Sequence, residues 1–506
     1  MHVQDVVADR AGSSRSTTAY CLCNDPSNLS NPVQPLRPID PVITFRNSQG
    51  DAVRGTLTNL QRRSLVMELY NPYSIVQVSE VLNTLTVRSG HKSVYKGKAV
   101  VVSLVNTGLM AVVSVTLTDE WSELAVIGHD AISFKDQANA FVEDWDSRFK
   151  ISRDYQVVIS EMRAYLADVS RWIDQADMDA TLPKDKSGRL REDVFLDIAH
   201  PLMTRARTYF DNLEQVAALI DPELQGPHRA FSQTAIHPLI LRAPFVYRTF
   251  AKPMGYAGDY EMVNQMLADP RDGGSTYFQI INALFLNAAV ATAHRNRIDI
   301  LTEYLSKLPE QLNSTEGDIR VLNVGCGPAI EIQRLIATHP TPERFVFSLM
   351  DFSEETLAYT RKRIDEACRV RGVAVRVELI HESVHALLKR ASGGRAVSAE
   401  TFDFVYCAGL FDYLSEKVCA RLIQYFSSRT RTGGHILVTN VHRQNPEKYS
   451  MEHLLEWHLI YRDETDMRRL VPTACVIDRI FTDPTGVNVF LDMVITATSG
   501  LPVSGR

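Results

Sequence analysis

The residues between 320 and 351 constrain the fold of this chain more than any other stretch. Arg320-Val-Leu-Asn-Val is short, β-branched and apolar, as a buried strand is. Gly325-Cys-Gly-Pro-Ala follows and predicts a tight turn, because glycine reaches positive φ without steric cost and leaves the backbone open to a ligand. Helical spacing over 330–336 comes next, and then a second apolar strand that ends in Asp351. This order predicts half of a doubly wound nucleotide-binding fold, with Asp351 placed to hold a ribose diol.

The spacing of the glycines indicates which nucleotide the turn would hold. A dinucleotide site needs G-x-G-x-x-G, whereas this chain has Asn323-x-Gly325-x-Gly327-x-Ala329, and no Lys-Ser/Thr pair follows as in a P-loop. The motif resembles the D/E-x-G-x-G-x-G sequence of class I S-adenosylmethionine (SAM) dependent methyltransferases, with Asn for the first acid and Ala for the last glycine. The resemblance implies SAM as the cofactor. A Rossmann-like fold that has lost its ligand, or one that binds decarboxylated SAM, is the alternative.

Length and charge limit the class of protein. A chain of 506 residues is too long for one core and predicts roughly two to four domains. Its net charge of -6 provides no basic field, so nucleic acid is not an expected partner. The cysteines are odd in number, scattered and without zinc spacing, which predicts reduced cytosolic thiols and no metal site. Residues 1–31 lack the apolar segment of a signal peptide, and no apolar run reaches the length of about 18 residues that a spanning helix needs. We therefore expect a cytoplasmic protein without a membrane span.

The first 130 residues predict a disordered tail and a small barrel. Residues 1–33 are polar and predict the tail. Residues 34–130 contain short apolar strands separated by turn residues, as a small closed or half-closed β-barrel does. The segment Thr58-Asn-Leu-Gln-Arg-Arg-Ser-Leu resembles the D-x-S-x-x-G loop of PilZ-type barrels. That resemblance implies a PilZ-like fold for this domain.

The PilZ ligand, cyclic di-GMP, is not expected to bind here. The family holds it with an R-x-x-x-R arm, and Arg37 and Arg46 have the wrong spacing for that arm. In the loop, Asn59, Gln61 and Ser64 stand where the family has Asp, Ser and Gly. We therefore expect the barrel to dock a partner or to form a homodimer.

Residues 131–245 are predicted to be helical, because apolar side chains recur there at i, i+3 and i+4. A charged segment from Asp179 to Arg191 is expected to be a loop between the helices. His200 and His237 are expected to cap or pack rather than to catalyse. This region supplies no predicted site residue.

Residues 246–300 are predicted to form a helical lid or substrate segment. Phe250 to Asn264 combines two glycines, two tyrosines and two acids beside a helix start, a mixture typical of loops that line a site. A helix from Tyr277 to Leu305 is predicted to follow, to roof the SAM pocket and to bring Arg295 to it. A helix hairpin with solvated arginines is the alternative.

Residues 301–506 are expected to form the SAM-binding methyltransferase domain, an α/β Rossmann-like fold. Ser353 with two acids after it predicts a helix N-terminus. Residues 375–380 predict a third strand. In class I methyltransferases the end of that strand holds the adenine amine, which implies this role for Glu382 or Ser383. A surface position for Glu382 is the alternative.

The fourth strand, 402–407, and its exit loop exclude some acceptors. Ligands bind open α/β sheets at this edge, yet the loop has Ala-Gly-Leu-Phe-Asp where methyltransferases of nucleobase amines carry N/D-P-P-Y/F. No Pro-Cys nucleophile is present for C5 chemistry, and Cys407 is expected to be a strand residue. The remaining predicted elements are a fifth strand at 433–440, a helix at 451–462 and an antiparallel pair at 474–478 and 489–495.

The predicted cofactor-binding residues lie on the turn, the strand ends and the lid. They are Asn323, Gly325, Cys326, Gly327, Asp351, Phe352, Glu382, Ser383, Ala408 and Arg295. No residue set predicts a metal site.

Three further segments resemble one bacterial family. Residues 252–262 (KPMGYAGDYEM), 409–414 (GLFDYL) and 457–462 (WHLIYR) are similar to synthases of 3-hydroxypalmitic acid methyl ester, a diffusible quorum signal, over roughly residues 130–495. The resemblance implies a SAM-dependent O-methyltransferase that forms the methyl ester of a 3-hydroxy fatty acid. Methylation of another small molecule or of a protein carboxylate is one alternative. A SAM-binding regulator with a sensory barrel is another.

The chemistry of the acceptor sets what the site must contain. A carboxylate is ionised at neutral pH and needs no strong base, whereas an alcohol or an amine would need one. His442 and Glu452 are predicted to act as a base or to hold a hydroxyl group, and Tyr256 and Tyr260 to roof the site. An apolar wall for an acyl chain is predicted from Leu410, Phe411, Tyr413, Trp457, Leu459 and Tyr461. Ordinary core packing of these side chains is the alternative.

Overall fold

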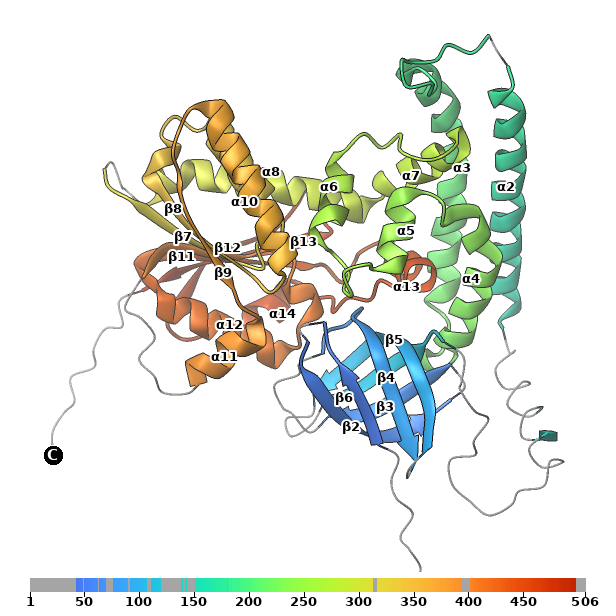
Figure 1. The fold of residues 1–506 in the computed structure, drawn as a ribbon, viewed down its shortest axis with the longest axis horizontal. Helices are drawn as coiled ribbons and strands as arrows, with labels where there is room; N and C mark the ends of the chain where they lie inside the picture. The colour runs from blue at the N-terminus through green and yellow to red at the C-terminus, as the bar shows by residue number, and fades with distance from the viewer. Residues whose placement is uncertain are drawn as a thin grey trace, which may run out of the picture. The chain divides into compact units, whose positions relative to one another are not determined.

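A computed structural model gives the structure of the chain. It describes residues 42–48, 50–61, 63–69, 76–89, 92–106, 111–119, 138–139, 142, 151–179, 181–312, 316–392 and 401–496. The predicted tail at 1–33 and Arg37 lie outside these residues. The described chain forms a barrel, a series of helices and a second, open sheet (Figure 1).

Strands β1 to β6 form the closed barrel that the sequence predicts. They pair antiparallel in the order β1-β2-β3-β6-β5-β4, and β1 also pairs with β4, which closes the barrel. Buried and partly exposed side chains alternate along β6, so every second residue faces the interior. The strands are β1 (Val42–Arg46), β2 (Ala52–Leu60), β3 (Ser64–Leu69), β4 (Val81–Ser89), β5 (Lys92–Asn106) and β6 (Ala111–Leu117).

The region after the barrel is helical, as predicted. Buried residues of α2 recur every three or four positions, which gives this helix one apolar face. The predicted charged loop separates α2 from α3. The elements are α2 (Arg153–Asp177), α3 (Glu192–Ala217), η1 (Pro222–Leu224), α4 (Gln225–Ile240), α5 (Pro244–Ala251), α6 (Tyr260–Leu267), α7 (Thr276–Leu286) and α8 (Ala289–Gln311).

The single helix predicted from Tyr277 to Leu305 is wrong, because the chain forms two helices there, bent by 62°. The carboxylate of Glu447 accepts hydrogen bonds from the N–H groups of Ala289 (2.7 Å) and Val290 (3.0 Å) at the start of α8. Such N–H groups have no partner within a helix, and an anion beside them also favours the helix dipole. A residue far along the chain therefore sets the start of α8.

Within the part of the chain that the structure describes, no single helix has the length and apolar composition to cross a membrane. The bent pair α7 and α8 meets that test only when both helices are counted together.

The C-terminal domain is built on a seven-stranded sheet in the order β12-β13-β11-β10-β7-β8-β9. Strands β11, β10, β7, β8 and β9 run parallel, whereas β13 is antiparallel to both of its neighbours. This confirms the predicted Rossmann-like sheet with a final antiparallel pair. The strands are β7 (Ile319–Val324), β8 (Phe345–Asp351), β9 (Arg376–His381), β10 (Phe402–Cys407), β11 (Thr430–Val441), β12 (Cys475–Thr482) and β13 (Asn488–Ile495).

Helices cover both faces of this sheet. Apolar residues of α8, α9 and α10 pack on one face, and those of α11, α12 and α14 pack on the other. Ser353 caps α10 as predicted, since its Oγ accepts from the N–H of Thr356 over 3.2 Å. The elements of this domain are α9 (Ile330–Thr338), η2 (Pro342–Arg344), α10 (Glu354–Arg371), α11 (Val384–Ser392), η3 (Phe411–Tyr413), α12 (Glu416–Arg429), α13 (Lys448–Leu455) and α14 (Glu464–Arg469).

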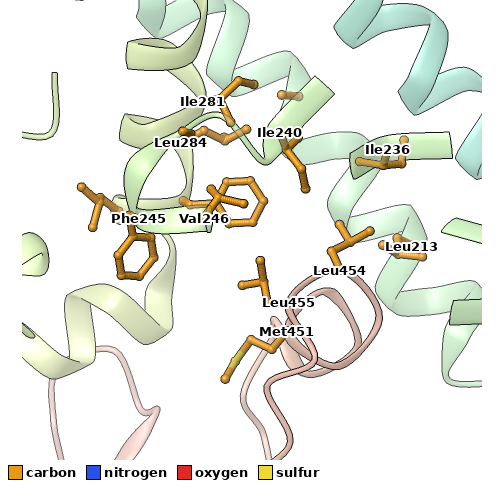
Figure 2. Packing of buried hydrophobic residues seen from close by; sticks show 14 of the residues in the cluster. Leu213, Ile236, Ile240, Phe245, Val246, Ile281, Leu284, Met451, Leu454 and Leu455 are labelled. Atoms are coloured by element: carbon orange, nitrogen blue, oxygen red, sulfur yellow. The ribbon is translucent and has the colours of Figure 1, made fainter. Parts of the chain in front are cut away.

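Helix α13 packs into the helical region. Its residues Met451, Leu454 and Leu455 belong to one buried cluster with Ile240 of α4 and Val246 of α5 (Figure 2). The same cluster includes residues of α3 and α7. The helical region and the segment after β11 therefore share one hydrophobic core.

The predicted helix over 451–462 is correct only in its first part, because α13 ends at Leu455. The next residue, Glu456, has a φ of 50°, in the left-handed region. Its buried carboxylate lies 3.0 Å from Nε of Arg229 and accepts from Nε2 of Gln233 over 2.8 Å. Arg229 and Gln233 of α4 thus hold the side chain of Glu456, the first residue after α13. Residues 457–462 have no regular secondary structure.

Candidate active site

A cavity lies where β7, β8 and β10 end, at the edge at which open α/β sheets bind ligands. The turn after β7, the end of β8, the exit of β10, α8 and the loop before α6 all contribute to it. The lining includes Tyr256, Tyr260, His294, Arg297, Asn323, Gly325, Cys326, Gly327, Asp351, Phe352, Glu382, Ala408, Gly409, Leu410 and Tyr413. The structure thus brings together most of the predicted cofactor-binding residues.

The glycine turn has the backbone conformation that its sequence requires. Gly325 (φ 72°) and Gly327 (φ 50°) are left-handed, and a Cβ on Gly325 would lie 3.3 Å from the side chain of Leu410. The N–H of Gly327 donates to Oδ2 of Asp351 over 3.1 Å, and the N–H of Ser353 donates to Oδ1 over 3.0 Å. Burial raises the pKa of Asp351, and these N–H groups oppose that shift. The turn and Asp351 form one hydrogen-bonded unit.

Behind the turn, Asn323 replaces the acid of the methyltransferase motif within a buried network. Its Nδ2 donates to the hydroxyl of Tyr406 over 2.9 Å, and that hydroxyl donates to Oε1 of Glu331 over 2.7 Å. Burial raises the pKa of Glu331, and the bond from Tyr406 opposes that shift. The network joins β7, β10 and α9 directly below the turn.

Tyr256, in the loop before α6, and Tyr260, the first residue of α6, both line the cavity. The ring of Tyr256 lies 4.9 Å from that of Phe352, and the ring of Tyr260 stacks on Tyr359 at 4.5 Å. The hydroxyl of Tyr260 also donates to Glu355 over 2.9 Å. Burial raises the pKa of both tyrosines, to about 12 for Tyr260, so both stay protonated at neutral pH. The position of the two residues fits the predicted roof.

A second hollow adjoins the cavity, and Phe352 and Glu382 line both. A carboxylate oxygen of Glu382 lies 2.8 Å from Arg390. Ser383 lines the second hollow, where its Oγ accepts from the N–H of Ala386 over 3.2 Å at the start of α11. The predicted adenine-binding residues therefore lie after β9, at the edge of the cavity.

His294 and Arg297 of α8 also line the cavity, and neither is among the predicted site residues. Nδ1 of His294 lies 2.8 Å from the carbonyl of Val290, and burial together with the charge of Arg297 lowers the pKa of His294 to about 3. The imidazole is neutral at physiological pH. Both residues are buried on one face of α8, three positions apart, so helical phase is the signal that could have found them.

Four predicted site residues lie outside the cavity lining: Ser383, described above, and three others. Arg295 donates to the carbonyl of Leu286 over 2.8 Å and so ties α8 to α7. His442, which follows β11, has its Nε2 at 3.2 Å from the carboxylate of Glu464. Glu452 lies on α13, and burial raises its pKa to about 7. Arg295, His442 and Glu452 thus lie away from the cavity lining, and their predicted roles stay predictions.

The predicted apolar wall is only partly present. Leu410 and Tyr413 line the cavity. The other members lie in packed hydrophobic cores: Phe411, Trp457, Leu459 and Tyr461. For these four the alternative, ordinary core packing, describes the structure.

The two cysteines nearest the turn are not nucleophiles. Cys326 lines the cavity, and Cys407 is the last residue of β10, as predicted. Burial raises the pKa of both thiols well above the usual value, so both remain protonated.

One group of described residues has the spacing of a cation site, although the sequence predicted none. Ligand atoms of His435, Asp478 and Asp492 lie within 4.8 Å of one another. Asp492 already accepts from the hydroxyl of Tyr304 over 3.0 Å and lies 3.3 Å from Arg479. These contacts satisfy its charge without a metal, and the group does not line the cavity.

Comparison with known proteins supports the assignment of the domain. Residues 321–434 match the family model described as a methyltransferase domain. No curated protein matches the chain. The matched segment runs from β7 into β11 and so contains the glycine turn, Asp351 and the exit of β10.

Several solved structures are similar in part. A possible exported protein from Bordetella parapertussis is 14% identical over 50% of this chain and 86% of its own, with a TM-score of 0.39. Magnesium protoporphyrin IX methyltransferase from Synechocystis PCC 6803 with bound SAH is 13% identical over 46% and 93%, with a TM-score of 0.32. N-methyltransferase NodS from Bradyrhizobium japonicum WM9 is 12% identical over 40% and 98%, with a TM-score of 0.28. At scores this low the likenesses carry no argument about the acceptor.

Proposed function

Because the chain carries a SAM-dependent methyltransferase domain, we propose that it methylates an oxygen of a small acid. The acid that we propose is a 3-hydroxy fatty acid, and the product is its methyl ester. The observation that supports a small acceptor is the roof over the turn. Tyr256 packs on Phe352, and Tyr260 is held by Tyr359 and Glu355, so the lid is braced against the domain that it covers. An enclosed site of this kind suits a small molecule.

The residues that line the cavity fit SAM. Asp351, at the end of β8, would hold the ribose hydroxyls, and Phe352 and Glu382 would border the adenine. Gly325 and Gly327 leave room for the ligand against the backbone of the turn, which a Cβ would take. SAM supplies a methyl group on a sulfonium, ready for in-line transfer to a nucleophile. The protein then has to hold the acceptor in line and to exclude water.

A carboxylate acceptor suits the protonation states in this cavity. The tyrosine hydroxyls of the roof and the thiol of Cys326 hold their protons at neutral pH. His294 is neutral, and its Nδ1 is engaged with a backbone carbonyl. A carboxylate is already ionised, so it needs none of these groups as a base. Its oxygen forms a bond to the methyl carbon as the carbon–sulfur bond breaks, and the ester carries no proton to remove.

An acyl chain suits the apolar part of the lining. Met262 and Val263 of α6, Ile298 and Leu301 of α8, and Leu410 after β10 all line the cavity. Burying a methylene group there is worth about 0.8 kcal/mol. A hydrocarbon chain therefore gains affinity at this site, whereas a strongly polar acceptor does not.

The proposal is tested with the purified full chain, SAM labelled on the methyl group, and 3-hydroxy fatty acids of increasing length. We expect labelled products that release methanol in mild alkali, as methyl esters do, and a KM that falls as the chain lengthens. Fatty alcohols of the same chain lengths serve as controls, because they lack the carboxylate that the proposal requires. The Asp351→Ala variant, whose affinity for SAM should be strongly lowered, is the control for the site.

The alternatives give different results in the same assay. Alkali-stable label would indicate methylation of a hydroxyl or an amine and would exclude the ester. Base-labile label on protein after incubation with cell extract would indicate a protein carboxylate. Tight SAM binding with no labelled product from any acid or extract would indicate a regulator that binds SAM without turnover.

A further inference from the structure

The guanidinium of Arg297 is buried in the wall of the cavity, and its Nη1 has no hydrogen-bond partner among the described residues. Arg297 is 8% exposed and lines the cavity from α8. Its Nη1 is inaccessible to solvent and has no hydrogen-bond partner, and among the described residues no carboxylate forms an ion pair with it. Burial lowers the pKa of this arginine, but an arginine keeps its charge throughout the physiological range. The cavity wall therefore contains a buried cation that no described residue pairs.

A second buried arginine, Arg462, differs from Arg297 in its hydrogen bonds. Arg462 donates to the carbonyls of Phe411 (2.8 Å) and Leu414 (2.6 Å), and to the side chain of Asn440 (2.7 Å). Its donors are used by the fold. Arg297 forms no such bond with any residue that the structure describes, so these contacts do not account for its burial.

The backbone beside Arg297 leaves space for its guanidinium. Gly409, the second residue after β10, has a φ of 93°, and a Cβ there would lie 2.9 Å from Nη1 of Arg297. The N–H of Gly409 is fixed by Oγ1 of Thr439 at 3.1 Å. The guanidinium therefore lies close to the backbone at the exit of β10, which also lines the cavity.

The charges nearby do not neutralise Arg297 directly. Asp412 is the acid with the largest electrostatic effect on it. The Oδ1 of Asp412 accepts from the N–H of Val441 over 2.6 Å, and burial raises its pKa to about 6, although the charge of Arg297 opposes that shift. No ion pair or hydrogen bond between described residues joins the two side chains. An uncompensated buried charge is costly, and a ligand anion would remove that cost.

We propose that Arg297 binds a carboxylate in the cavity that it lines. A guanidinium presents a planar fork of N–H donors that matches the two oxygens of a carboxylate. Two ligands of this site carry such a group. One is the amino acid part of SAM, and the other is the acid acceptor, so that only the second source rests on the proposed function.

The test compares Arg297→Gln with the wild-type full chain by titration calorimetry, using pairs of ligands that differ in the carboxylate. S-adenosylhomocysteine and 5′-methylthioadenosine are both neutral thioethers, and only the first carries the amino acid group. A 3-hydroxy fatty acid and the matching fatty alcohol, each added to protein saturated with S-adenosylhomocysteine, form the second pair. Loss of a charged hydrogen-bonded pair should weaken the carboxylate-bearing ligand by about 10- to 100-fold and leave the other member of its pair unchanged.

The outcomes separate the two sources. A selective loss for S-adenosylhomocysteine assigns Arg297 to the cofactor, and a selective loss for the acid assigns it to the acceptor. Unchanged affinity for all ligands, or an equal loss for both members of each pair, overturns the proposal. If the wild-type protein binds no acid, the proposed function fails, whereas the first pair still tests Arg297.

Two further variants guard against misfolding. Arg297→Lys keeps the charge but not the fork, so it should show a smaller selective loss, of about 3- to 10-fold, even if Arg297→Gln does not fold. Arg295→Gln is the matched control, because Arg295 lies two residues away on α8 and is bound to backbone carbonyls. Its effect, if any, should be equal on both members of a pair.

Discussion

Nε1 of Trp457 donates a hydrogen bond to the hydroxyl of Tyr413 over 3.0 Å. Tyr413 lines the cavity, whereas Trp457 is 1% exposed and belongs to the core of the helical region. The bond therefore connects the segment after α13 to the exit of β10. It gives Trp457 a supporting role behind the cavity wall, in place of the direct contact with an acyl chain that the sequence predicted.

Trp457→Phe should lower stability more than it lowers ligand affinity. The change leaves space in a packed core and removes the donor to Tyr413, which should cost about 1 to 3 kcal/mol in the free energy of unfolding. Affinity for SAM should change by less than about threefold. Equilibrium unfolding in urea and calorimetry check this, with the exposed Trp172→Phe as the control. A loss of SAM affinity at unchanged stability would place Trp457 in the binding surface instead.

Asp351→Ala should lower SAM affinity strongly. Asp351 is a buried acceptor at the end of β8, and losing a charged acceptor for two ribose hydroxyls should cost about 2 to 4 kcal/mol of binding free energy. Calorimetry with SAM measures the loss. Asp365→Ala, an exposed acid on α10, is the control and should bind SAM normally. Normal SAM affinity in a folded Asp351→Ala protein would show that the site has been placed wrongly.

Local patterns explain what the sequence predicts well. The strands of the C-terminal sheet are short apolar runs that end in turn residues, and the cap at Ser353 depends on the next three residues only. Buried and partly exposed side chains alternate along the barrel strand β6, which is also a local pattern. Asp351 and the glycine turn lie at adjacent strand ends in any fold of this class. Their contact therefore also follows from the order of the strands alone.

Contacts between distant residues explain what the sequence does not predict. Glu447 starts α8, although it lies about 160 residues further on in the chain. Arg229 holds Glu456 where α13 stops. The break before α8 also sets its phase, which turns Arg297 rather than Arg295 to the cavity. Such pairs are set by tertiary packing, and a two-residue error in helical phase selects the wrong arginine.

The barrel should not bind cyclic di-GMP. Arg46 donates to the carbonyl of Gly50 over 2.9 Å, within its own turn. Ser64 donates to Oε1 of Gln61 over 3.0 Å, within the loop that resembles the PilZ loop. Calorimetry of the full chain with cyclic di-GMP should show no heat of binding. Saturable binding in the micromolar range would contradict this prediction and show that the chain binds the PilZ ligand.

His453 should make stability fall as the pH is lowered. Its Nδ1 lies 2.7 Å from the hydroxyl of Tyr155 and its Nε2 lies 2.7 Å from Oε1 of Gln225, which suits the neutral ring. Burial, and then the charge of Arg229, lower the pKa of His453 to about 3. The unfolded chain, with an ordinary pKa of about 6.5, binds the proton first, so stability is complete above that value and decreases between about pH 6.5 and 3.

The matched variant for this prediction is His453→Gln. It should lower stability at neutral pH, and it lacks the imidazole that the unfolded wild-type chain protonates first. The difference in unfolding free energy between wild type and variant should shrink by about 1 kcal/mol from pH 7.5 to pH 5.5. Urea unfolding at the two pH values measures it. A difference that stays constant would mean that His453 titrates alike in both states.

Gly409→Ala should act on Arg297, and Gly486→Ala provides the matched control. Both glycines have positive φ, 93° and 74°, so both substitutions carry the strain of a left-handed alanine, about 1 to 2 kcal/mol. A Cβ at Gly486 meets no atom within 4 Å, whereas one at Gly409 lies 2.9 Å from Nη1 of Arg297. Only Gly409→Ala should therefore displace the guanidinium and weaken the same carboxylate-bearing ligand that Arg297→Gln weakens. Equal stability of the two variants, together with wild-type affinity for both members of each ligand pair, would show that Arg297 does not depend on the space that Gly409 leaves.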